Sequence, residues 1–492
     1  MSDHSTPRHA EFVKALTLTD ATMLVAGSMI GSGIFIVSAD ISRTLGSPGW
    51  LLLAWVVTGI VTVLGALAFG ELAAMYPRAG GMYTFLREAM GPLMGFLYGW
   101  TLFIVIQTGT IAAVAVGFGK FLGVLFPAVT ADRWALAVDI KTGGTTLELG
   151  LSWQRVAALI SVWVLTWVNL RGVKEGKWVQ TVLTFLKTAS LAALILLALS
   201  LGRNADAIAA NFGAGNFWGG TPDFAGLLVV TFGSALVGSL FSADSWHAPT
   251  FAAAEVQDPA RNLPRALLIG TVMVTGLYVL ANLAYLVVLP LHGAADGATI
   301  MARGIDHATQ DRVATAVMES IFGPSGALIM AGAIIVSTIG CNNGLILSGA
   351  RVYYAMARDG LFFARAGELS EKGVPAFALV VQSLWTSLLC LSGTYNQLLD
   401  YVIFAALIFY ALTTVGLFML RKKKPNEHRP YKAIGYPVLP ALYVLAAAGV
   451  AVTLLVADKT RVQALSGLVI VLLGVPVYLL WHGGKKTAGA QR

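Results

Sequence analysis

The first long apolar segment, Leu18 to Ala39, carries at its centre the run Ser28-Met29-Ile30-Gly31-Ser32-Gly33-Ile34-Phe35. Gly31, Ser32 and Gly33 have little or no side chain, so they weaken a helix and leave backbone N–H and C=O groups open to close approach. Inside a bilayer, such backbone is tolerated only where protein buries it or where it lines a polar cavity. We therefore expect the helix to be interrupted at this point.

Composition indicates a polytopic membrane protein. The chain has 492 residues, of which 57% are hydrophobic and only 12% are charged, and this is too apolar for a soluble protein of this length. The polar segment Met1 to Lys14 leads into the first apolar stretch without a small-residue cleavage site, so we expect this span to be retained. Cys341 and Cys390 lie in apolar segments and are interpreted as core residues. No motif predicts a cofactor or a metal.

Apolar stretches predict an all-α membrane protein with twelve transmembrane helices. An even number places both termini on the same side of the membrane. The predicted spans are Leu18–Ala39, Trp50–Met75, Leu93–Leu125, Val156–Leu170, Val179–Leu201, Phe224–Phe251, Ala266–Leu289, Gly326–Arg351, Pro375–Leu391, Leu398–Leu420, Tyr436–Ala457 and Val462–Leu480.

Basic residues orient these spans. If the N-terminus is cytoplasmic, 22 of the 33 Lys and Arg residues fall in inside loops and ten fall outside, and the remaining one is Lys187 in span five. This bias predicts both termini in the cytoplasm, with the chain in the plasma (inner) membrane. It also explains the net charge of +8 without a polyanionic partner, so we expect no nucleic-acid binding.

The spans divide the chain into successive segments. Residues 421–435, with four consecutive basic residues, are interpreted as a solvated cytoplasmic linker before two extra helices. The predicted segments are a cytoplasmic tail (1–17), a first five-helix set (18–201), an outer loop (202–223), a second five-helix set (224–420), the basic linker (421–435), helices eleven and twelve (436–482) and a cytoplasmic tail (483–492).

The sixth span also predicts an interrupted helix. Between Gly233 and Pro249 it combines small residues with a charge, Asp244, and a proline, and these disfavour a continuous helix. Spans one and six are the first members of the two five-helix sets. Interrupted segments at corresponding positions of two halves indicate an inverted-repeat secondary transporter with its site between them. The odd number of spans in the first set gives the second set the opposite direction through the membrane.

Free helix ends suggest what such a site binds. The second half of span one would present unpaired N–H groups from Ser32 to Ile34, which suit a carboxylate. The first half of span six would end in carbonyls around Phe241 to Ala243, which suit an ammonium. Together they predict a cradle for a zwitterion. The alternative is that the Gly-Ser-Gly run only allows close helix packing.

Two charges lie well inside spans and each needs a partner, because a charge costs about 2.5 to 3.5 kcal/mol on insertion scales. Lys187 could hold a cation position permanently, as a bound sodium would, or carry a proton; the alternative is a lysine that snorkels to the cytoplasmic surface. Asp244 could cap the second half of span six or lie near the substrate amine. Phe241 could cover the site or pack in the core, and His247 is interpreted as a packing residue.

Several short motifs together resemble the amino acid-polyamine-organocation superfamily, in particular the bacterial relatives of the L-type amino-acid transporters. The resemblance covers about Leu18 to Leu480. It implies a five-plus-five inverted repeat with two extra C-terminal helices and sodium-independent amino-acid transport, commonly by exchange. The motifs are Ile30-Gly31-Ser32-Gly33-Ile34-Phe35, Gly46-Ser47-Pro48-Gly49, the Pro77/Gly80-Gly81/Tyr83 loop, Asp258-Pro259-Ala260-Arg261-Asn262-Leu263-Pro264-Arg265 and Arg429-Pro430-Tyr431-Lys432.

The resemblance also implies roles for individual residues. Substrate-binding positions in and beside the two interruptions are Met29, Gly31, Ser32, Gly33, Phe241, Ser242 and Asp244. The carboxylate contacts among them fall on Met29, Ser32 and Gly33, and the amine contacts fall on the three span-six residues. The span-five lysine of the family corresponds to Lys187.

This chain departs from the family pattern at two places. Many relatives have an aromatic residue and a glycine in span six where this chain has Ala243 and Ser245, which leaves the identity of the amino acid open. Residues 131–153, in the outer loop between spans three and four, contain no cysteine, so we expect no disulfide-linked glycoprotein partner. We expect the protein to work as a monomer or a weak homo-oligomer.

The main functional hypothesis is an exchanger of neutral L-amino acids that works by alternating access without sodium. A proton-coupled symporter and a polyamine or cationic amino-acid transporter are the alternatives within transport. A membrane-embedded enzyme is less well supported, because no HExxH, GxSxG or GxxxxGK[ST] motif is present. Nothing indicates the continuous polar pore of a channel.

Overall fold

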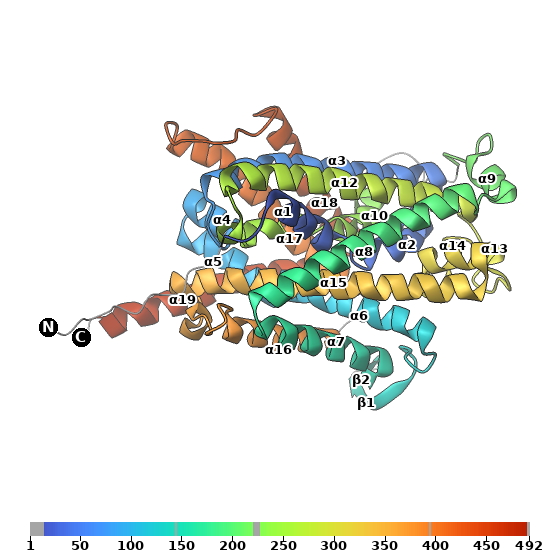
Figure 1. Ribbon diagram of the computed structural model, residues 1–492, viewed down its shortest axis with the longest axis horizontal. Helices are drawn as coiled ribbons and strands as arrows, with labels where there is room; N and C mark the ends of the chain where they lie inside the picture. Colours follow the sequence, from blue (N-terminus) through green and yellow to red (C-terminus); the bar gives the residue numbers. More distant parts are fainter. Residues whose placement is uncertain (1–13, 143–144, 220–226, 393–394, 490–492) are drawn as a thin grey trace.

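The computed structural model describes residues 14–142, 145–219, 227–392 and 395–489, and in these ranges the chain is almost entirely helical (Figure 1). This confirms the predicted all-α class. Parts of the predicted tails (1–17 and 483–492) and of the predicted outer loop (202–223), together with the proposed start of span six at Phe224, lie outside the described residues. The first half contains α1 (Leu18–Met29), η1 (Gly33–Phe35), α2 (Ser38–Leu45), α3 (Pro48–Met75), α4 (Met82–Met90), α5 (Pro92–Thr101), η2 (Leu102–Ile106), α6 (Gln107–Leu125), β1 (Trp134–Thr142), β2 (Thr145–Ser152), α7 (Trp153–Leu170), α8 (Val173–Ser200) and α9 (Ala205–Phe212).

The second half is helical throughout its described residues. Its elements are α10 (Leu227–Ser242), α11 (Ala248–Phe251), η3 (Ala253–Glu255), α12 (Pro259–Val288), α13 (Ile300–Arg303), η4 (Thr309–Asp311), α14 (Val313–Phe322), α15 (Pro324–Arg358), η5 (Ala364–Gly367), α16 (Ala376–Ser392), α17 (Tyr395–Lys423), α18 (Val438–Val456) and α19 (Arg461–Gly489). Figure 1 shows the long helices running side by side, with α4 at one end of the bundle and α9, α13 and α14 at the other.

Eight described helices are long and apolar enough to cross a membrane. The remaining four predicted spans are shorter or broken: spans one and six are interrupted, and α7 and α16 have 18 and 17 residues. The total of twelve spans therefore stays a prediction. The eight segments are Pro48–Met75, Pro92–Leu125, Gln180–Ser200, Pro259–Val288, Pro324–Arg358, Tyr395–Lys423, Val438–Val456 and Arg461–Trp481.

Both predicted interruptions are present. In span one, α1 ends at Met29 and the chain continues through the short 3₁₀ turn η1 into α2. In span six, α10 ends at Ser242 and a turn leads to α11. The start of α1 is fixed by Thr17 and Asp20, whose side chains each accept from the other's backbone N–H.

Some helix ends differ from the sequence-based limits. α12 begins at Pro259 instead of Ala266 and includes Pro264, and α15 continues past the predicted end at Arg351 to Arg358. The extra turns of α12 are polar, so hydropathy gives no signal for them, whereas the extra turns of α15 are mostly apolar. A more substantial difference is the antiparallel hairpin of β1 and β2 in the outer loop, where only an ordered loop was expected. The alternation of apolar and polar residues in this stretch was its signal.

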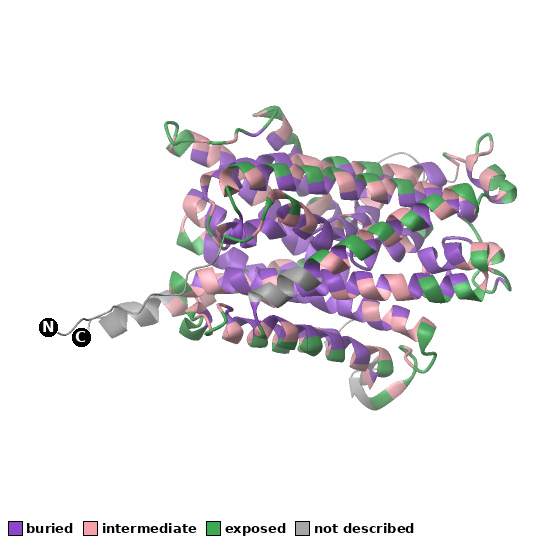
Figure 2. Ribbon diagram, in the orientation of Figure 1, coloured by how far each residue is buried: buried purple, intermediate pink, exposed green. Residues whose placement is uncertain are grey.

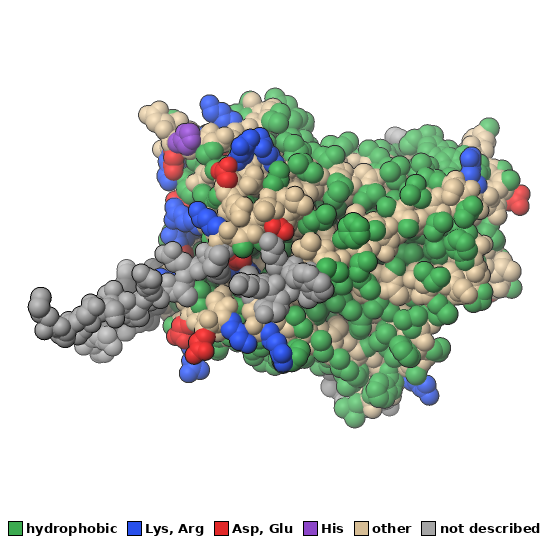
Figure 3. All heavy atoms as spheres, in the orientation of Figure 1, with side chains coloured by type: hydrophobic (Ala, Val, Ile, Leu, Met, Phe, Trp, Pro, Cys, Tyr) green, Lys and Arg blue, Asp and Glu red, His purple; other side chains and the backbone are tan. Residues whose placement is uncertain are grey.

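Exposed apolar side chains cover the outside of the bundle. Phe185, Leu196, Val229 and Leu445 are 64%, 67%, 67% and 68% exposed, and many other helix positions are also exposed (Figure 2). Figure 3 shows hydrophobic side chains over the middle of the molecule, while most visible Lys and Arg side chains gather at the end that carries α4. An apolar surface of this extent indicates contact with lipid, and the protein is a multi-pass membrane protein.

The basic linker after α17 is anchored to the bundle instead of being only solvated. Its anchor is Glu71 of α3, which is fully buried. Arg421 donates two hydrogen bonds to the Glu71 carboxylate, at 2.9 and 2.6 Å, and Arg429 pairs with it at 3.2 Å. The backbone N–H of Ala433 donates to the same carboxylate at 2.7 Å. Most residues of the linker are exposed, as the prediction of a solvated segment requires, and the anchor is an additional feature that the buried carboxylate needs.

Glu71→Gln tests this anchor. The change removes the charge that two guanidinium groups share, and breaking a buried ion pair typically lowers the free energy of unfolding by about 3–5 kcal/mol. We expect a clearly lower melting temperature for the variant purified in detergent. The control is Glu427→Gln, which removes a half-exposed partner of Lys424 at 3.4 Å and should cost below about 1 kcal/mol. Equal melting temperatures for the two variants would contradict the anchoring role.

Candidate functional site

The carbonyl groups before the break in span one are all satisfied by side chains from other helices. They belong to residues 27 to 31, and their donors come from α8, α12 and α15. Lys187 Nζ donates to Gly27 and to Ile30 at 2.8 Å, Cys341 Sγ to Ser28 at 3.2 Å, Tyr278 to Met29 at 2.9 Å, and Ser337 to Ile30 and Gly31 at 3.2 Å each.

The N–H groups after this break are unsatisfied. Among the described residues, no acceptor bonds to the backbone N–H of residues 31 to 34. All four residues are buried, and Ser32 and Ile34 are fully buried. Buried N–H groups are rarely left without a partner, so this arrangement indicates a place for an external acceptor. A carboxylate suits it, because it accepts several N–H bonds at once.

The break in span six contains a strained residue. Ser245 has a φ of 63°, in the left-handed region that favours glycine. This is the position at which the family pattern has a glycine. The turn that separates α10 from α11 therefore forms here without glycine, at a cost of about 1–3 kcal/mol that the surrounding packing must offset.

The two breaks lie against each other. Tyr278 of α12 donates to Met29 in the first break at 2.9 Å and approaches the carbonyl of Ser242 in the second at 3.1 Å. Its hydroxyl has one hydrogen, so it serves one carbonyl at a time or is shared between both. Gly33 faces Ser242 so closely that a Cβ on Gly33 would lie 2.9 Å from the Ser242 Cβ. Residues far apart in sequence thus form one site.

One face of α12 holds the broken span, and the sequence analysis missed it. Besides Tyr278, Asn282 accepts from Ser38 of α2 at 2.6 Å, and Tyr285 donates to Ile34 at 3.2 Å. The spacing of these three residues, four and then three, places them on one helix face. Polar groups at helical spacing inside an apolar span need buried partners, and that pattern could have predicted this contact.

Aromatic side chains lie beside the break in span one. Ser32 Oγ is 3.1 Å from the hydroxyl of Tyr395 in α17. The ring of Tyr395 meets Phe241 edge to face, with centroids 6.1 Å apart. Phe241 is buried, with 6% of its surface exposed. These contacts place Phe241 next to the interruption, where it can both cover the site and pack against its neighbours.

Lys187 lies inside the bundle and does not snorkel. It is fully buried, and its ammonium is hydrogen-bonded to carbonyls of Gly27 and Ile30 at the end of α1. The snorkelling alternative is therefore wrong. A cation at the carbonyl end of a helix is favourably placed, since the unpaired carbonyls carry partial negative charge. The ammonium thus neutralises the carbonyl end of α1.

Asp244 does not cap α11, so that alternative is wrong. The first residue of α11 has no side-chain cap, and Asp244 Oδ1 accepts a hydrogen bond from Tyr410 of α17. His247 Nδ1 lies 3.4 Å from the same hydroxyl, and its ring packs against Phe251 with centroids 5.1 Å apart. The packing interpretation of His247 agrees with this position. The carboxylate of Asp244 thus bonds to α17.

The carbonyl end of α10 is partly occupied. Phe241 accepts from the N–H of Asp244 at 3.1 Å, and Ser242 accepts from Tyr278. Each carbonyl oxygen can accept a second bond. The carbonyl of Ala243 has no partner within the described part of the chain and the residue is buried. Open acceptor capacity for an ammonium therefore lies within the predicted range Phe241 to Ala243, and it is greatest at Ala243. No group of metal-ligating residues is found among the described positions.

Gly33→Ala tests the close contact of the two breaks. The added methyl would meet Ser242, and such overpacking typically costs about 1–3 kcal/mol. We expect a lower melting temperature in detergent. The control is Gly276→Ala in α12, where an added Cβ meets nothing within 4 Å and a helical alanine should be neutral or stabilising. A Gly33→Ala variant that melts like this control would refute the contact.

Comparison with known proteins agrees with this geometry. The family model described as amino acid permease matches residues 16–476. The chain is 31% identical over 478 residues to the serine/threonine exchanger SteT of Bacillus subtilis, covering 96% of this chain and 97% of that protein. It is 32% identical to the mouse large neutral amino acids transporter small subunit 2 (95% and 81% covered) and 29% identical to the mouse b(0,+)-type amino acid transporter 1 (88% and 81%). These relatives are transporters and not enzymes, so the enzyme alternative is excluded. Because the family model matches nearly the whole chain, the chain belongs to the amino acid permease family.

Proposed function

We propose that this protein is a sodium-independent exchanger of neutral L-amino acids that works by alternating access. Its place would be the plasma (inner) membrane, with both termini cytoplasmic, as the positive-inside bias predicts. The observation that carries the proposal is the inequality at the first break: carbonyls 27–31 are filled by side chains, whereas N–H groups 31–34 are open. A ligand with a carboxylate completes this arrangement.

Each end of an amino acid has a complementary place. The carboxylate accepts from the backbone at Gly31, Ser32 and Gly33, next to Met29. The ammonium donates to carbonyls at the end of α10, where Ala243 is open and Phe241 and Ser242 keep a second acceptor position. Asp244 contributes at longer range through its negative charge, because its carboxylate is engaged by Tyr410. Ala243 stands where the family has a larger aromatic residue, and Ser245 stands where it has a glycine. These two residues set the space for the side chain of the amino acid.

Lys187 supports independence from sodium. Its ammonium bonds the carbonyls of Gly27 and Ile30, so the positive charge that holds the end of α1 is covalently part of the chain. A bound sodium would compete with it for the same oxygens. Proton-coupled symport is the second candidate. The burial of Lys187 favours it, because a desolvated lysine can lose its proton.

The two five-helix sets, 18–201 and 224–420, are proposed to move against each other around the fixed site. Tyr278 is a suitable link between them, since it joins the break of the first set to that of the second. We further propose that the protein works as a monomer or a weak homo-oligomer without a disulfide-linked partner. The two cysteines, Cys341 and Cys390, are buried and free.

Exchange without sodium is tested in proteoliposomes. Vesicles loaded with a neutral amino acid should take up the labelled compound at equal rates in sodium and in choline buffer. Vesicles without internal amino acid should accumulate little. Strict dependence on sodium would refute the proposal, and accumulation in empty vesicles under an imposed inward proton gradient would favour the symport alternative instead.

Lys187→Ala tests the role of the buried ammonium. Loss of the ammonium leaves the buried Gly27 carbonyl without its side-chain donor and the Ile30 carbonyl with Ser337 alone, so we expect the exchange rate to fall at least about tenfold, the equivalent of 1.4 kcal/mol. The matched control is Lys422→Ala, which removes an exposed lysine and should leave the rate unchanged. Wild-type exchange by correctly folded Lys187→Ala protein would show that the assigned role is wrong.

A further inference from the structure

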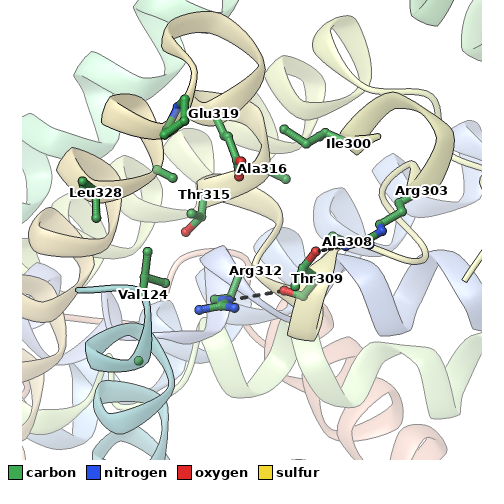
Figure 4. A pocket seen from close by; sticks show the side chains of 13 residues that line it. Val124, Ile300, Arg303, Ala308, Thr309, Arg312, Thr315, Ala316, Glu319 and Leu328 are labelled. Atoms are coloured by element: carbon green, nitrogen blue, oxygen red, sulfur yellow. Dashed lines mark hydrogen bonds between the residues drawn. The ribbon is translucent and has the colours of Figure 1, made fainter. Parts of the chain in front are cut away.

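A cavity with several polar side chains in its wall lies at the end of the bundle that the positive-inside pattern predicts to be extracellular. Its volume is about 440 Å³, which is in the usual range for small-molecule sites. Figure 4 shows its walls, formed by the end of α6, the short helix α13, α14 and the start of α15. Arg303, Arg312, Thr315 and Glu319 supply its polar groups.

Two polar groups of this cavity have unused hydrogen-bonding capacity. Thr315 is 5% exposed, and its hydroxyl oxygen has no hydrogen-bond partner among the residues that the structure describes. Arg312 forms no ion pair with any described residue, and its two hydrogen bonds, to the carbonyls of Thr309 and Lys120, are long, at 3.3 and 3.5 Å. Burial lowers the pKa of this guanidinium, and the nearby charge of Glu319 opposes that effect. Both groups can bind an acceptor.

The third group carries the opposite charge. Glu319 lies four residues after Thr315, so the two are neighbours on one face of α14, and Arg312 is the residue directly before the helix. Glu319 is in no ion pair with any described residue. The wall therefore presents a cation, a hydroxyl and a carboxylate in order. This order fits a zwitterion better than a simple anion, which Glu319 would repel.

The cavity and the break in span one both contact α6. A Cβ on Gly117 would lie 2.7 Å from the side-chain oxygen of Ser32, and Gly123 lines the cavity six residues later, about 9 Å along the helix axis. Lys120 lies between them. Its carbonyl accepts from Arg312, and its ammonium lies 6.0 Å from the ring of Tyr395, which contacts Ser32.

We propose that this cavity is an outer vestibule site that holds an amino-acid zwitterion before it reaches the broken helices. The carboxylate is bound by Arg312 and Thr315, and the ammonium is directed to Glu319. This inference rests on the proposed function, because it takes the same substrate class. It adds a capture site that acts on one face of the membrane only.

Sided exchange measurements test the vestibule. In proteoliposomes of known protein orientation, Arg312→Gln should raise the KM for a neutral amino acid supplied from the cavity side about tenfold, the loss expected for one charge-assisted hydrogen bond. The KM from the opposite side should change less than twofold. Thr315→Val, which keeps the shape of the side chain, should act in the same direction by a smaller factor. Arg461→Gln is the control, since this exposed arginine does not line the cavity; it pairs with exposed Asp458 at 2.8 Å and donates to the carbonyls of Leu455 and Val456, so its loss should leave both KM values unchanged.

Glu319→Gln separates a zwitterion site from an anion site. It should also raise the KM on the cavity side, because the ammonium loses its partner. A lower KM in this variant would reveal a plain anion site and overturn the proposal. For Arg312→Gln, an unchanged KM on the cavity side, or equal changes on both sides, would also overturn it. Absence of exchange by the wild-type protein would overturn the proposed function itself. Wild-type exchange with unaffected variants would overturn only the vestibule.

Discussion

Unequal hydrogen bonding on the two sides of the first break governs the rest of this structure. The carbonyls before the break are occupied by donors from three other helices, and the N–H groups after it remain open. In a bilayer, free backbone groups are costly, so such a break persists only if protein or ligand satisfies them. The protein satisfies one side itself and leaves the other open to a ligand. The arrangement of α8, α12 and α15 around α1 follows from the donors they must supply.

Buried charge is the main cost of this arrangement. Lys187 brings an ammonium into the bundle, where it is stable only because two carbonyls of α1 replace its hydration. Ser245 adds backbone strain at the second break. Tyr278 ties the two breaks together, so a movement that opens one must change its contact with the other. This coupling is what alternating access requires of a site formed between two halves.

The sequence was sufficient for the helical class, the family and the positions of both interruptions, because glycine, proline and charge have strong local effects inside apolar segments. It could also single out Lys187, since a lysine in mid-span needs a partner. It could not show which partner, and the capping role considered for Asp244 failed because Tyr410, 166 residues away, binds that carboxylate. The polar face of α12 and the anchor at Glu71 depend likewise on long-range contacts. The hairpin of β1 and β2 was not predicted, because the alternation of apolar and polar residues in this stretch was not interpreted as a strand signal.

The account requires that the protein recognise both ends of an amino acid at once. The most direct measurement is the melting temperature of the purified protein with a neutral L-amino acid, with the corresponding amine that lacks the carboxylate, and with a simple polyamine. A ligand that binds the folded state raises the apparent stability by mass action. The account predicts a concentration-dependent rise with the amino acid and none with the amine. Stabilisation by the amine or the polyamine, with none by any neutral amino acid, would contradict it.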